Sequence, residues 1–259
     1  MSLELTVSVS DDGIATLDWS GTLSSESLER ALRAAADEML LDQQLRRVEV
    51  SAPADDLVTR RAVLRAGFRL EGVRRQVLER SDGSYADLCL FARLASDQVG
   101  GSHGFSSVMN SALPKKRLIA HVLMRDVRNR VLLCETQFKK DWELPGGIVE
   151  PSEPPRLGAA REVAEELGIE LEIGRLLVVD WMPPYLGWDD AIEMIFDGGM
   201  VAENDLACWS LQPTEIKAVA LVDLPTASEL LTPLAFRRLN IAAALGPDEM
   251  AYTEDGRTP

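Results

Sequence analysis

The chain has 259 residues, 46% of them hydrophobic, which is enough for one large domain or two ordinary domains with real cores. Its formal net charge of −15 excludes general nucleic-acid binding and anionic-membrane binding, because both need a positive field to offset phosphates. There is no basic leader followed by an apolar run, and no apolar stretch approaches about 18 residues. We therefore expect a cytoplasmic globular protein. Arginine outnumbers lysine 22 to 5, which is typical of a bacterial genome rich in G and C.

The cysteines and histidines carry no metal or redox pattern. Cys89, Cys134 and Cys208 stand singly in apolar surroundings, without C-x-x-C spacing or an even-numbered disulfide framework. We expect all three to be buried free thiols. His103 and His121 form no cluster for zinc or for a nucleophilic triad, so neither is assigned a role.

Residues 1 to 94 predict a small α+β domain. Apolar residues alternate over 5–9 and 14–19 around the turn residues Asp11, Asp12 and Gly13, a pattern typical of a β-hairpin. Gly67 is expected to end a helix. The other expected elements follow in chain order: a helix opened by Ser24 or Ser25 and running to about 41, a strand over 46–52, a helix over 57–66, and strands over 73–79 and 85–92.

The segment from residue 46 to 94 contains GFRLEG between a helix and two final strands. It resembles the C-terminal half of GNAT acetyltransferases, and the resemblance covers about residues 25 to 94. Asp56 and Thr59 stand where the family has Asn and Ser, and SGTLSSES, from Ser20 to Ser27, replaces its glycine-bearing pyrophosphate loop. We interpret residues 1–94 as a truncated, non-catalytic GNAT-like domain. An active acetyltransferase is the less favoured alternative.

A segment rich in glycine and serine, ASDQVGGSHGFSSVMNS, interrupts the apolar periodicity. We expect a linker over 95–113 and a second domain over 114–259. A truncated sheet leaves an edge and an apolar face uncovered. We therefore expect the N-terminal module to be structural, covered by the second domain, by a second copy of the chain in a homodimer, or by both.

The most informative motif is GIVEPSEPPRLGAAREVAEELGI, which begins at Gly147. Pro154 and Pro155 suit the first turn of a helix, and Gly168 suits its left-handed exit. Ser152 or Glu153 is expected to cap the helix.

This helix carries three carboxylates on one face. At about 100° per residue Glu162, Glu165 and Glu166 lie together, while the apolar residues 160, 163, 164 and 167 gather on the opposite face as core. Such carboxylates repel one another by a few tenths of a kcal/mol per pair, and a hard divalent cation would offset that repulsion. Arg161 can orient Glu165 from outside the metal shell. The alternative is a solvated acidic face with ordinary charge pairs.

The motif matches the Nudix signature, G-x5-E-x7-R-E-U-x-E-E-x-G-U with U an apolar residue, at every defined position. These positions are Gly147, Glu153, Arg161, Glu162, Val163, Glu165, Glu166, Gly168 and Ile169. The chain therefore resembles the Nudix hydrolases over about residues 115–256. The resemblance implies an α/β/α sandwich with a mixed sheet, with strands expected over 117–124, 130–134, 171–179, 191–196 and 219–223 and a helix over 233–245.

The resemblance also implies roles for particular residues. Glu162, Glu165, Glu166 and the carbonyl of Gly146 match positions that bind Mg²⁺ or Mn²⁺. Glu153, with Gly147 and Gly168, matches positions that brace the loop and helix. In PTEIKAVALVDL, Glu215 is the best match to a further ligand or general base, and the alternative is a solvated loop acid.

Outside the motif, the loop DWMPPYLGWDD offers Trp181, Tyr185 and Trp188 as stacking partners for a substrate. Trp181 lies at a strand end, and the alternative is that it belongs to the core. The chain is expected to be a pyrophosphohydrolase that uses Glu165, Glu166, Arg161 and Glu215 in catalysis. It would cleave a nucleoside diphosphate linked to X, such as a nucleotide sugar, an ADP-ribose-like compound or a nucleoside triphosphate. The alternative is a nucleotide sensor that binds without hydrolysis, against which the intact acidic triad argues.

Overall fold

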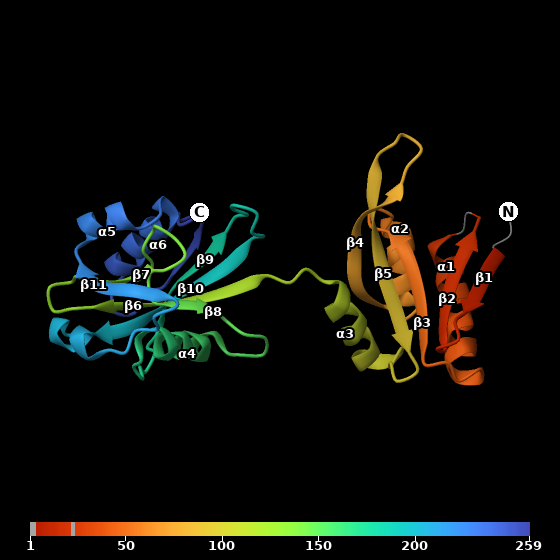
Figure 1. Cartoon of the computed structure of the whole chain (residues 1–259), viewed down its shortest axis with the longest axis horizontal. Coiled ribbons are helices and arrows are strands. Elements are labelled where there is room, and N and C mark those ends of the chain that lie inside the picture. Colours follow the sequence, from red (N-terminus) through yellow and green to blue (C-terminus); the bar gives the residue numbers. More distant parts are fainter. Residues whose placement is uncertain (1–3, 22–23) are drawn as a thin grey trace. The chain divides into compact units, whose positions relative to one another are not determined.

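The computed structural model describes residues 4–21 and 24–259, which divide into two compact units between Pro114 and Lys115. Each unit has its own mixed sheet, as Figure 1 shows, so the expected mixed α/β class is confirmed. Among the described helices, none has the length and apolar character needed to cross a membrane.

The first unit is a five-stranded sheet in the order β1-β2-β3-β5-β4. The expected hairpin is present, because β1 and β2 pair antiparallel, and β2 then runs parallel to β3. Leu32 of α1, Val63 of α2, and Phe68 and Phe91 are buried in its core. The bounds are β1 Glu4–Val9, β2 Ile14–Ser20, α1 Ser25–Asp37 with a π-helical turn Glu38–Asp42, β3 Arg47–Pro53, α2 Leu57–Arg65, β4 Arg69–Glu79 and β5 Tyr85–Leu94.

Local side-chain chemistry explains the helix bounds in this unit. The Ser24 hydroxyl accepts a hydrogen bond from the Ser27 N–H and caps α1. The Asp56 carboxylate accepts from the N–H and the hydroxyl of Thr59 and caps α2, which ends before Gly67 at φ +95°. Asp56 and Thr59 therefore form a helix cap. Thr22 and Leu23, within the segment that replaces the pyrophosphate loop, lie outside the described residues.

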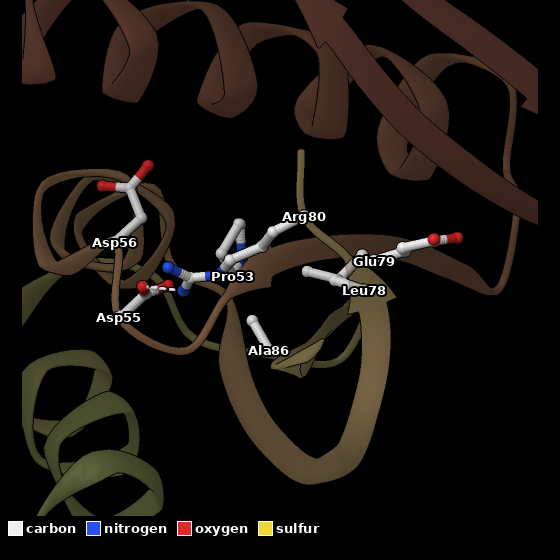
Figure 2. A pocket seen from close by; sticks show the side chains of 7 residues that line it. All are labelled: Pro53, Asp55, Asp56, Leu78, Glu79, Arg80 and Ala86. Carbon is white, nitrogen blue, oxygen red and sulfur yellow. Dashed lines mark hydrogen bonds and ion pairs between the residues drawn. The ribbon is translucent and has the colours of Figure 1, made fainter. Parts of the chain in front are cut away.

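A shallow pocket of about 420 Å³ lies at the β3–α2 turn (Figure 2). Its cation, Arg80, forms an ion pair with Asp55, whereas the Asp56 side chain is directed away from that pair. The charged groups of this turn are therefore committed to each other or to the helix cap.

The segment expected to be a linker is largely helical. Helix α3 (Gly101–Ala112) packs against β4 of the first unit, where the hydroxyl of Ser111 accepts a hydrogen bond from the Leu70 N–H at 3.0 Å. Gly104 fits closely, because a Cβ there would lie 2.6 Å from the carbonyl oxygen of Gln98. Glycine and serine lower helix propensity, but tertiary packing outweighs propensity here. The linker prediction is therefore wrong for residues 101–112.

The second unit is built on a sheet in the order β11-β7-β6-β10-β9-β12, with β8 pairing to β6. Strands β6 and β10 are parallel, as are β9 and β12, and the other pairs are antiparallel. The bounds are β6 Arg117–Arg125, β7 Val131–Thr136, β8 Gly146–Ile148, α4 Pro155–Leu167, β9 Leu176–Met182, β10 Ala191–Met200, a 3₁₀ helix Glu203–Cys208, β11 Ile216–Val222, α5 Leu224–Leu230, α6 Pro233–Ala244 and β12 Ala251–Glu254.

Helices cover both faces of this sheet, with α4 on one side and α5 and α6 on the other (Figure 1). Alternation along β6 supplies both layers: Val122 packs with Val163 of α4, and Leu123 packs with Leu239 of α6. The expected α/β/α sandwich is therefore present.

Several local predictions differ from the structure. Helix α4 starts after Pro154 without a side-chain cap, because the Glu153 carboxylate binds the Glu150 N–H and Arg161. Cys89 and Cys134 are buried, but Cys208 is exposed at the end of the 3₁₀ helix. Strand β9 starts at Leu176, five residues later than expected. In the second unit, the described elements that the sequence did not predict are β8, the 3₁₀ helix, α5 and β12.

Candidate active site

The site begins where β8 pairs with β6, with Gly146 opposite His121. Gly146 has φ +128°, and a Cβ there would lie 2.2 Å from the carbonyl oxygen of Ala120. Only glycine fits this position, since both the backbone angle and the close approach exclude a side chain. The strand therefore brings the Gly146 backbone against the start of the site.

Glu166 reaches this strand from the last turn of α4. Its Oε2 accepts a hydrogen bond from the Gly146 N–H at 2.8 Å, and the residue is only 6% exposed. Burial raises the pKa of Glu166 to about 7, although the hydrogen bond opposes the rise. The acidic face is therefore not simply solvated, because one of its three carboxylates is buried against the β8 backbone.

Glu162 and Glu165 lie progressively closer to solvent. The Glu162 side chain is 16% exposed, and a Cβ at Gly147 would lie 2.8 Å from its Oε2. Burial raises the pKa of Glu162, and the charges of Glu165 and Glu215 add to the rise. The Glu165 side chain is 56% exposed.

Arg161 holds the acidic groups in place. Its Nη1 lies 3.0 Å from both Glu162 Oε1 and Glu165 Oε2. Its Nε and Nη2 contact the two carboxylate oxygens of Glu153 at 2.9 and 3.0 Å, a bidentate pair. Its Nη2 also donates to the carbonyl of Ile148 in β8. The hydrogen bonds to Glu153 and Glu162 raise the pKa of Arg161. Arg161 therefore ties α4 to the loop and orients Glu162 and Glu165.

The donors gathered here are all hard oxygen atoms. Within the described ranges, no three acidic, histidine or cysteine side chains converge as a ready metal site, and Arg161 occupies the space between Glu162 and Glu165. The donor chemistry nevertheless fits Mg²⁺ or Mn²⁺, which bind carboxylate and carbonyl oxygens. Burial raises the pKa of both Glu162 and Glu166, neighbouring carboxylates add to the rise, and a bound cation would offset that added repulsion.

Glu215 lies exposed just before β11. Its backbone carbonyl accepts a hydrogen bond from the Gln137 N–H at 2.8 Å, and its charge acts on Glu162. The structure thus brings Glu215 near the α4 carboxylates from a distant part of the sequence.

A cavity of about 600 Å³ lies within the second unit, on the side of the sheet that α6 covers. Tyr185 and Trp188 line it, but Trp181 does not, since it is half-buried and its Nε1 donates to Asp190 Oδ2 at 3.1 Å. His121 and Glu143 line the cavity, and their charges also act on Glu166. The cavity therefore borders the acidic site.

The aromatic wall of the cavity is a tight hairpin tip. Tyr185 and Trp188 face each other across Leu186 and Gly187, both at positive φ, as in a two-residue turn. The Arg117 guanidinium lies 4.6 Å from the centroid of the Trp188 ring. These contacts hold the tip over the cavity.

Sequence reasoning missed a buried polar network at this cavity. Arg238 Nη2 lies 2.7 Å from Glu193 Oε2, and its Nη1 contacts Asp180 Oδ2 at 3.2 Å. Glu193 Oε1 lies 3.0 Å from His121 Nδ1. Burial lowers the pKa of His121, but the Glu193 carboxylate outweighs this and raises it. Only the alternation of polar His121 within an apolar strand could have signalled this group.

Comparisons with known proteins give partial matches. The chain is 42% identical over 64 residues to diphosphoinositol polyphosphate phosphohydrolase 2 of Rattus norvegicus, covering 24% of this chain and 36% of that protein. It is 33% identical over 118 residues to CMP-5'-(N-acetyl-N-hydroxy-3-aminopropyl)phosphonate hydrolase of Streptomyces rubellomurinus, covering 43% of this chain and 54% of that protein. The chain thus spans between about a third and about half of the length of these curated relatives.

Solved structures are also similar to parts of the chain. A MutT protein from Methanosarcina mazei is 28% identical, covers 51% of this chain and 94% of its own, and gives a TM-score of 0.41. A ribosomal-protein-S5-alanine acetyltransferase from Vibrio fischeri is 20% identical, covers 37% of this chain and 55% of its own, and gives a TM-score of 0.32.

A family model gives the broadest assignment. The NUDIX domain model matches residues 115–245, just over half of the chain, and this range contains the complete signature on β8 and α4. The chain belongs to the NUDIX domain family.

Proposed function

We propose that the chain is a metal-dependent pyrophosphohydrolase that cleaves a nucleoside diphosphate linked to X into a nucleoside monophosphate and phosphorylated X. The observation that carries the proposal is the acidic site itself. Glu162, Glu165 and Glu166 project from one helix, Arg161 contacts Glu162 and Glu165, and Glu166 is buried against Gly146.

Glu162, Glu165, Glu166 and the Gly146 carbonyl are the proposed ligands of Mg²⁺ or Mn²⁺. When bound, the cation would neutralise the diphosphate and lower the pKa of the attacking water. Arg161 holds Glu162 and Glu165 in position, its pairing with Glu153 fixes the loop between β8 and α4, and its hydrogen bond to the Ile148 carbonyl holds the end of β8. Glu215, whose charge reaches Glu162, is proposed as a further ligand or as the general base.

The substrate would lie with its diphosphate at α4 and its remaining part in the adjoining cavity. Tyr185 and Trp188 line that cavity and are the proposed stacking partners. Trp181 has its indole N–H committed to Asp190 and does not line the cavity, so a core role suits it better. The names of the relatives suggest a CMP-linked phosphonate and a diphosphoinositol polyphosphate as compounds to test beside nucleotide sugars, ADP-ribose and nucleoside triphosphates.

The test is a substrate panel with the purified full chain, assayed with Mg²⁺, with Mn²⁺ and with EDTA. We expect one or more compounds to yield a nucleoside monophosphate only when a metal is present. Absence of turnover across the panel with both metals would count against the proposal, and tight nucleotide binding without turnover would favour a sensor.

We propose that the first unit has a structural, non-catalytic role. We also propose that the whole protein is bacterial and cytoplasmic and forms homodimers. Asp56 and Thr59 are used as a helix cap, which supports the absence of acetyl transfer. Titration of the full chain with acetyl-CoA tests the catalytic part, and micromolar binding would overturn it. Light scattering compares the oligomeric state of residues 114–259 with that of the full chain. An unchanged oligomeric state would contradict a role of the first unit in dimer formation.

A further inference from the structure

Strand β1 forms one edge of the first unit's sheet. The strand order is β1-β2-β3-β5-β4, so among the described strands β1 pairs with β2 and with no other (Figure 1). An edge strand presents a row of backbone N–H and C=O groups that can pair with another chain. Sheets usually block such pairing with charges, bulges or a covering element, and the two edges of this sheet differ in these features.

The opposite edge, β4, is protected in all of these ways. Its sequence, RLEGVRRQVLE, carries five charged side chains, and helix α3 packs against it. Its pairing with β5 shifts register between Arg74 and Leu78. Within this bulge Gln76 has φ +50°, and its N–H donates to Asp87 Oδ1 at 2.8 Å. The β4 edge is therefore poorly suited to pairing with a further strand.

Over residues 4–9, strand β1 lacks this protection. Its sequence, ELTVSV, carries a single charge, Glu4, at one end, and its pairing with β2 has no register shift. Val7 is 38% exposed and Val9 is 52% exposed, although they stand opposite the buried Leu17 and Ala15 of β2 on the core face of the sheet. The strand therefore offers an open backbone edge with a partly uncovered apolar strip beside it.

The hairpin shows which backbone groups of β1 are directed outward. The Ser10 N–H donates to the Ile14 carbonyl at 2.9 Å, so residue 10 is hydrogen-bonded toward β2. Ladder bonds alternate along an antiparallel pair, so every second residue before Ser10 also bonds to β2. The N–H and C=O groups of Leu5, Val7 and Val9 are therefore directed away from the sheet.

This pattern makes β1 complementary to a second copy of itself. An antiparallel pair related by a two-fold axis at Val7 places Val7 opposite Val7 of the second copy, and Leu5 opposite Val9. These are the residues whose backbone groups are directed outward, so hydrogen bonds and apolar side chains match in the same register. On the polar face of the sheet, Thr6 would stand opposite Ser8, and hydroxyl pairs of this kind stabilise neighbouring strands.

Charge favours the same register and the same occupant. Two copies of a chain with a net charge of −15 repel each other, so a contact between them is favoured where charge is lowest. From Leu5 to Ser10 the sequence carries no charge. Sliding the pair by two residues toward the turn would place Glu4 opposite Asp12 of the second copy, and this repulsion disfavours that register.

We propose that two copies of the chain pair through β1, antiparallel and centred on Val7, so that their five-stranded sheets join into one continuous sheet across a two-fold axis. The inference rests on the homodimer proposed above and adds the surface, the register and the residues that form it. Leu5, Val7 and Val9 then become the apolar strip of a subunit interface.

The first test measures the mass of the full chain by sedimentation equilibrium over a dilution series, where we expect a reversible dimer. Val7→Lys brings two like charges together at the centre of the pair and should raise the dissociation constant of the dimer at least about tenfold. Val77→Lys is the matched control, because Val77 is also 38% exposed but lies on the β4 edge. This control should dimerise as wild type does.

Cross-linking tests the register without a change of charge. The background is Cys208→Ser, which removes the exposed native thiol. In it, Val7→Cys should form a disulfide between copies under mild oxidation, because hydrogen-bonded partners on antiparallel strands have Cα atoms about 5.5 Å apart. Val9→Cys is the control, since the proposed register separates the two copies of position 9 by about 13 Å along the strands.

Three results would each overturn the proposal: a wild-type chain that stays monomeric throughout the series, an unchanged dissociation constant in Val7→Lys, or equal cross-linking at positions 7 and 9. Because Val7→Cys is a conservative change, cross-linking decides the matter even if Val7→Lys is poorly folded.

These outcomes are separable from those of the proposed function. A dimer that persists in Val7→Lys keeps the homodimer but contradicts this surface. A monomeric chain that hydrolyses a substrate keeps the proposed enzyme and contradicts β1 pairing. A dimer cross-linked through position 7 that hydrolyses nothing does the opposite.

Discussion

The backbone N–H of Gly146 donates a hydrogen bond to Oε2 of Glu166 across 20 positions of sequence. This contact joins the last turn of α4 to the edge strand β8 and removes the Glu166 carboxylate from solvent. Because Gly146 has no room for a Cβ, the contact depends on glycine at that position. The site is therefore assembled from a helix and a strand that fix each other.

Glu166→Gln should lower kcat by at least about a hundredfold, on the scale of losing a catalytic metal interaction. Glutamine keeps an oxygen that can accept from the Gly146 N–H, and it avoids a buried charge, so the melting temperature should not fall. Steady-state kinetics and thermal unfolding measure the two effects. Glu170→Gln, an exposed change just past α4, is the control. A rate near that of wild type would refute the role of Glu166.

Arg161→Lys should reduce kcat by about ten- to a hundredfold while leaving the net charge unchanged. Lysine cannot reproduce the fork that contacts Glu153, Glu162 and Glu165 together, so the carboxylates lose their orientation. Arg156→Lys on the same helix should retain activity, since the Arg156 side chain donates a hydrogen bond to the carbonyl of Ile173 and not to the site carboxylates. Equal activity in the two variants would show that orientation by Arg161 is not needed.

Arg238→Met should lower the free energy of unfolding of the second unit by about 3–5 kcal/mol. The change leaves the buried carboxylates of Glu193 and Asp180 without their cation. Arg237 lies beside Arg238 in the sequence and pairs with the half-exposed Asp255. Arg237→Met should therefore lower the free energy of unfolding much less. Urea unfolding followed by tryptophan fluorescence compares them. Similar losses in the two variants would contradict a network organised by Arg238.

The stability contributed by Glu193 should disappear in acid. Burial raises the pKa of Glu193, but Arg238 and His121 outweigh burial and hold that pKa below its ordinary value of 4.5. A carboxyl group with a lowered folded-state pKa stabilises the protein above its ordinary pKa and loses that contribution as the pH falls through the folded value. The advantage of wild type over Glu193→Gln in urea unfolding should therefore shrink between pH 6 and pH 3. A constant difference across that range would mean that Glu193 is not the titrating group.

The sequence predicted the helix that carries the site because its signals are local. Prolines at the start, Gly168 at φ +69° and three glutamates at helical spacing all lie within one short segment. A fully solvated acidic face, the alternative interpretation of the helical wheel, does not hold for Glu166, which is 6% exposed. Burial of that residue depends on β8, which no periodicity in the three residues Gly146–Ile148 could reveal.

The cavity could not be predicted for a related reason. His121, Glu193 and Arg238 come from β6, β10 and α6, and only the parallel pairing of β6 with β10 and the packing of α6 bring them together. Likewise, the glycines and serines of α3 read as a linker, because its helix is stabilised by packing on β4 rather than by propensity. Long-range contacts decided each of these cases.

The most direct test of the enzyme assignment is ³¹P NMR of the full chain incubated with ADP-ribose and nucleotide sugars in the presence of Mg²⁺ or Mn²⁺. The account predicts that the coupled diphosphate resonances are replaced by two monoester resonances, one from the nucleoside monophosphate and one from phosphorylated X. It also predicts that EDTA and Glu166→Gln prevent the change. Diphosphate resonances that persist with both metals across the substrates, or that disappear equally with EDTA, would contradict the assignment.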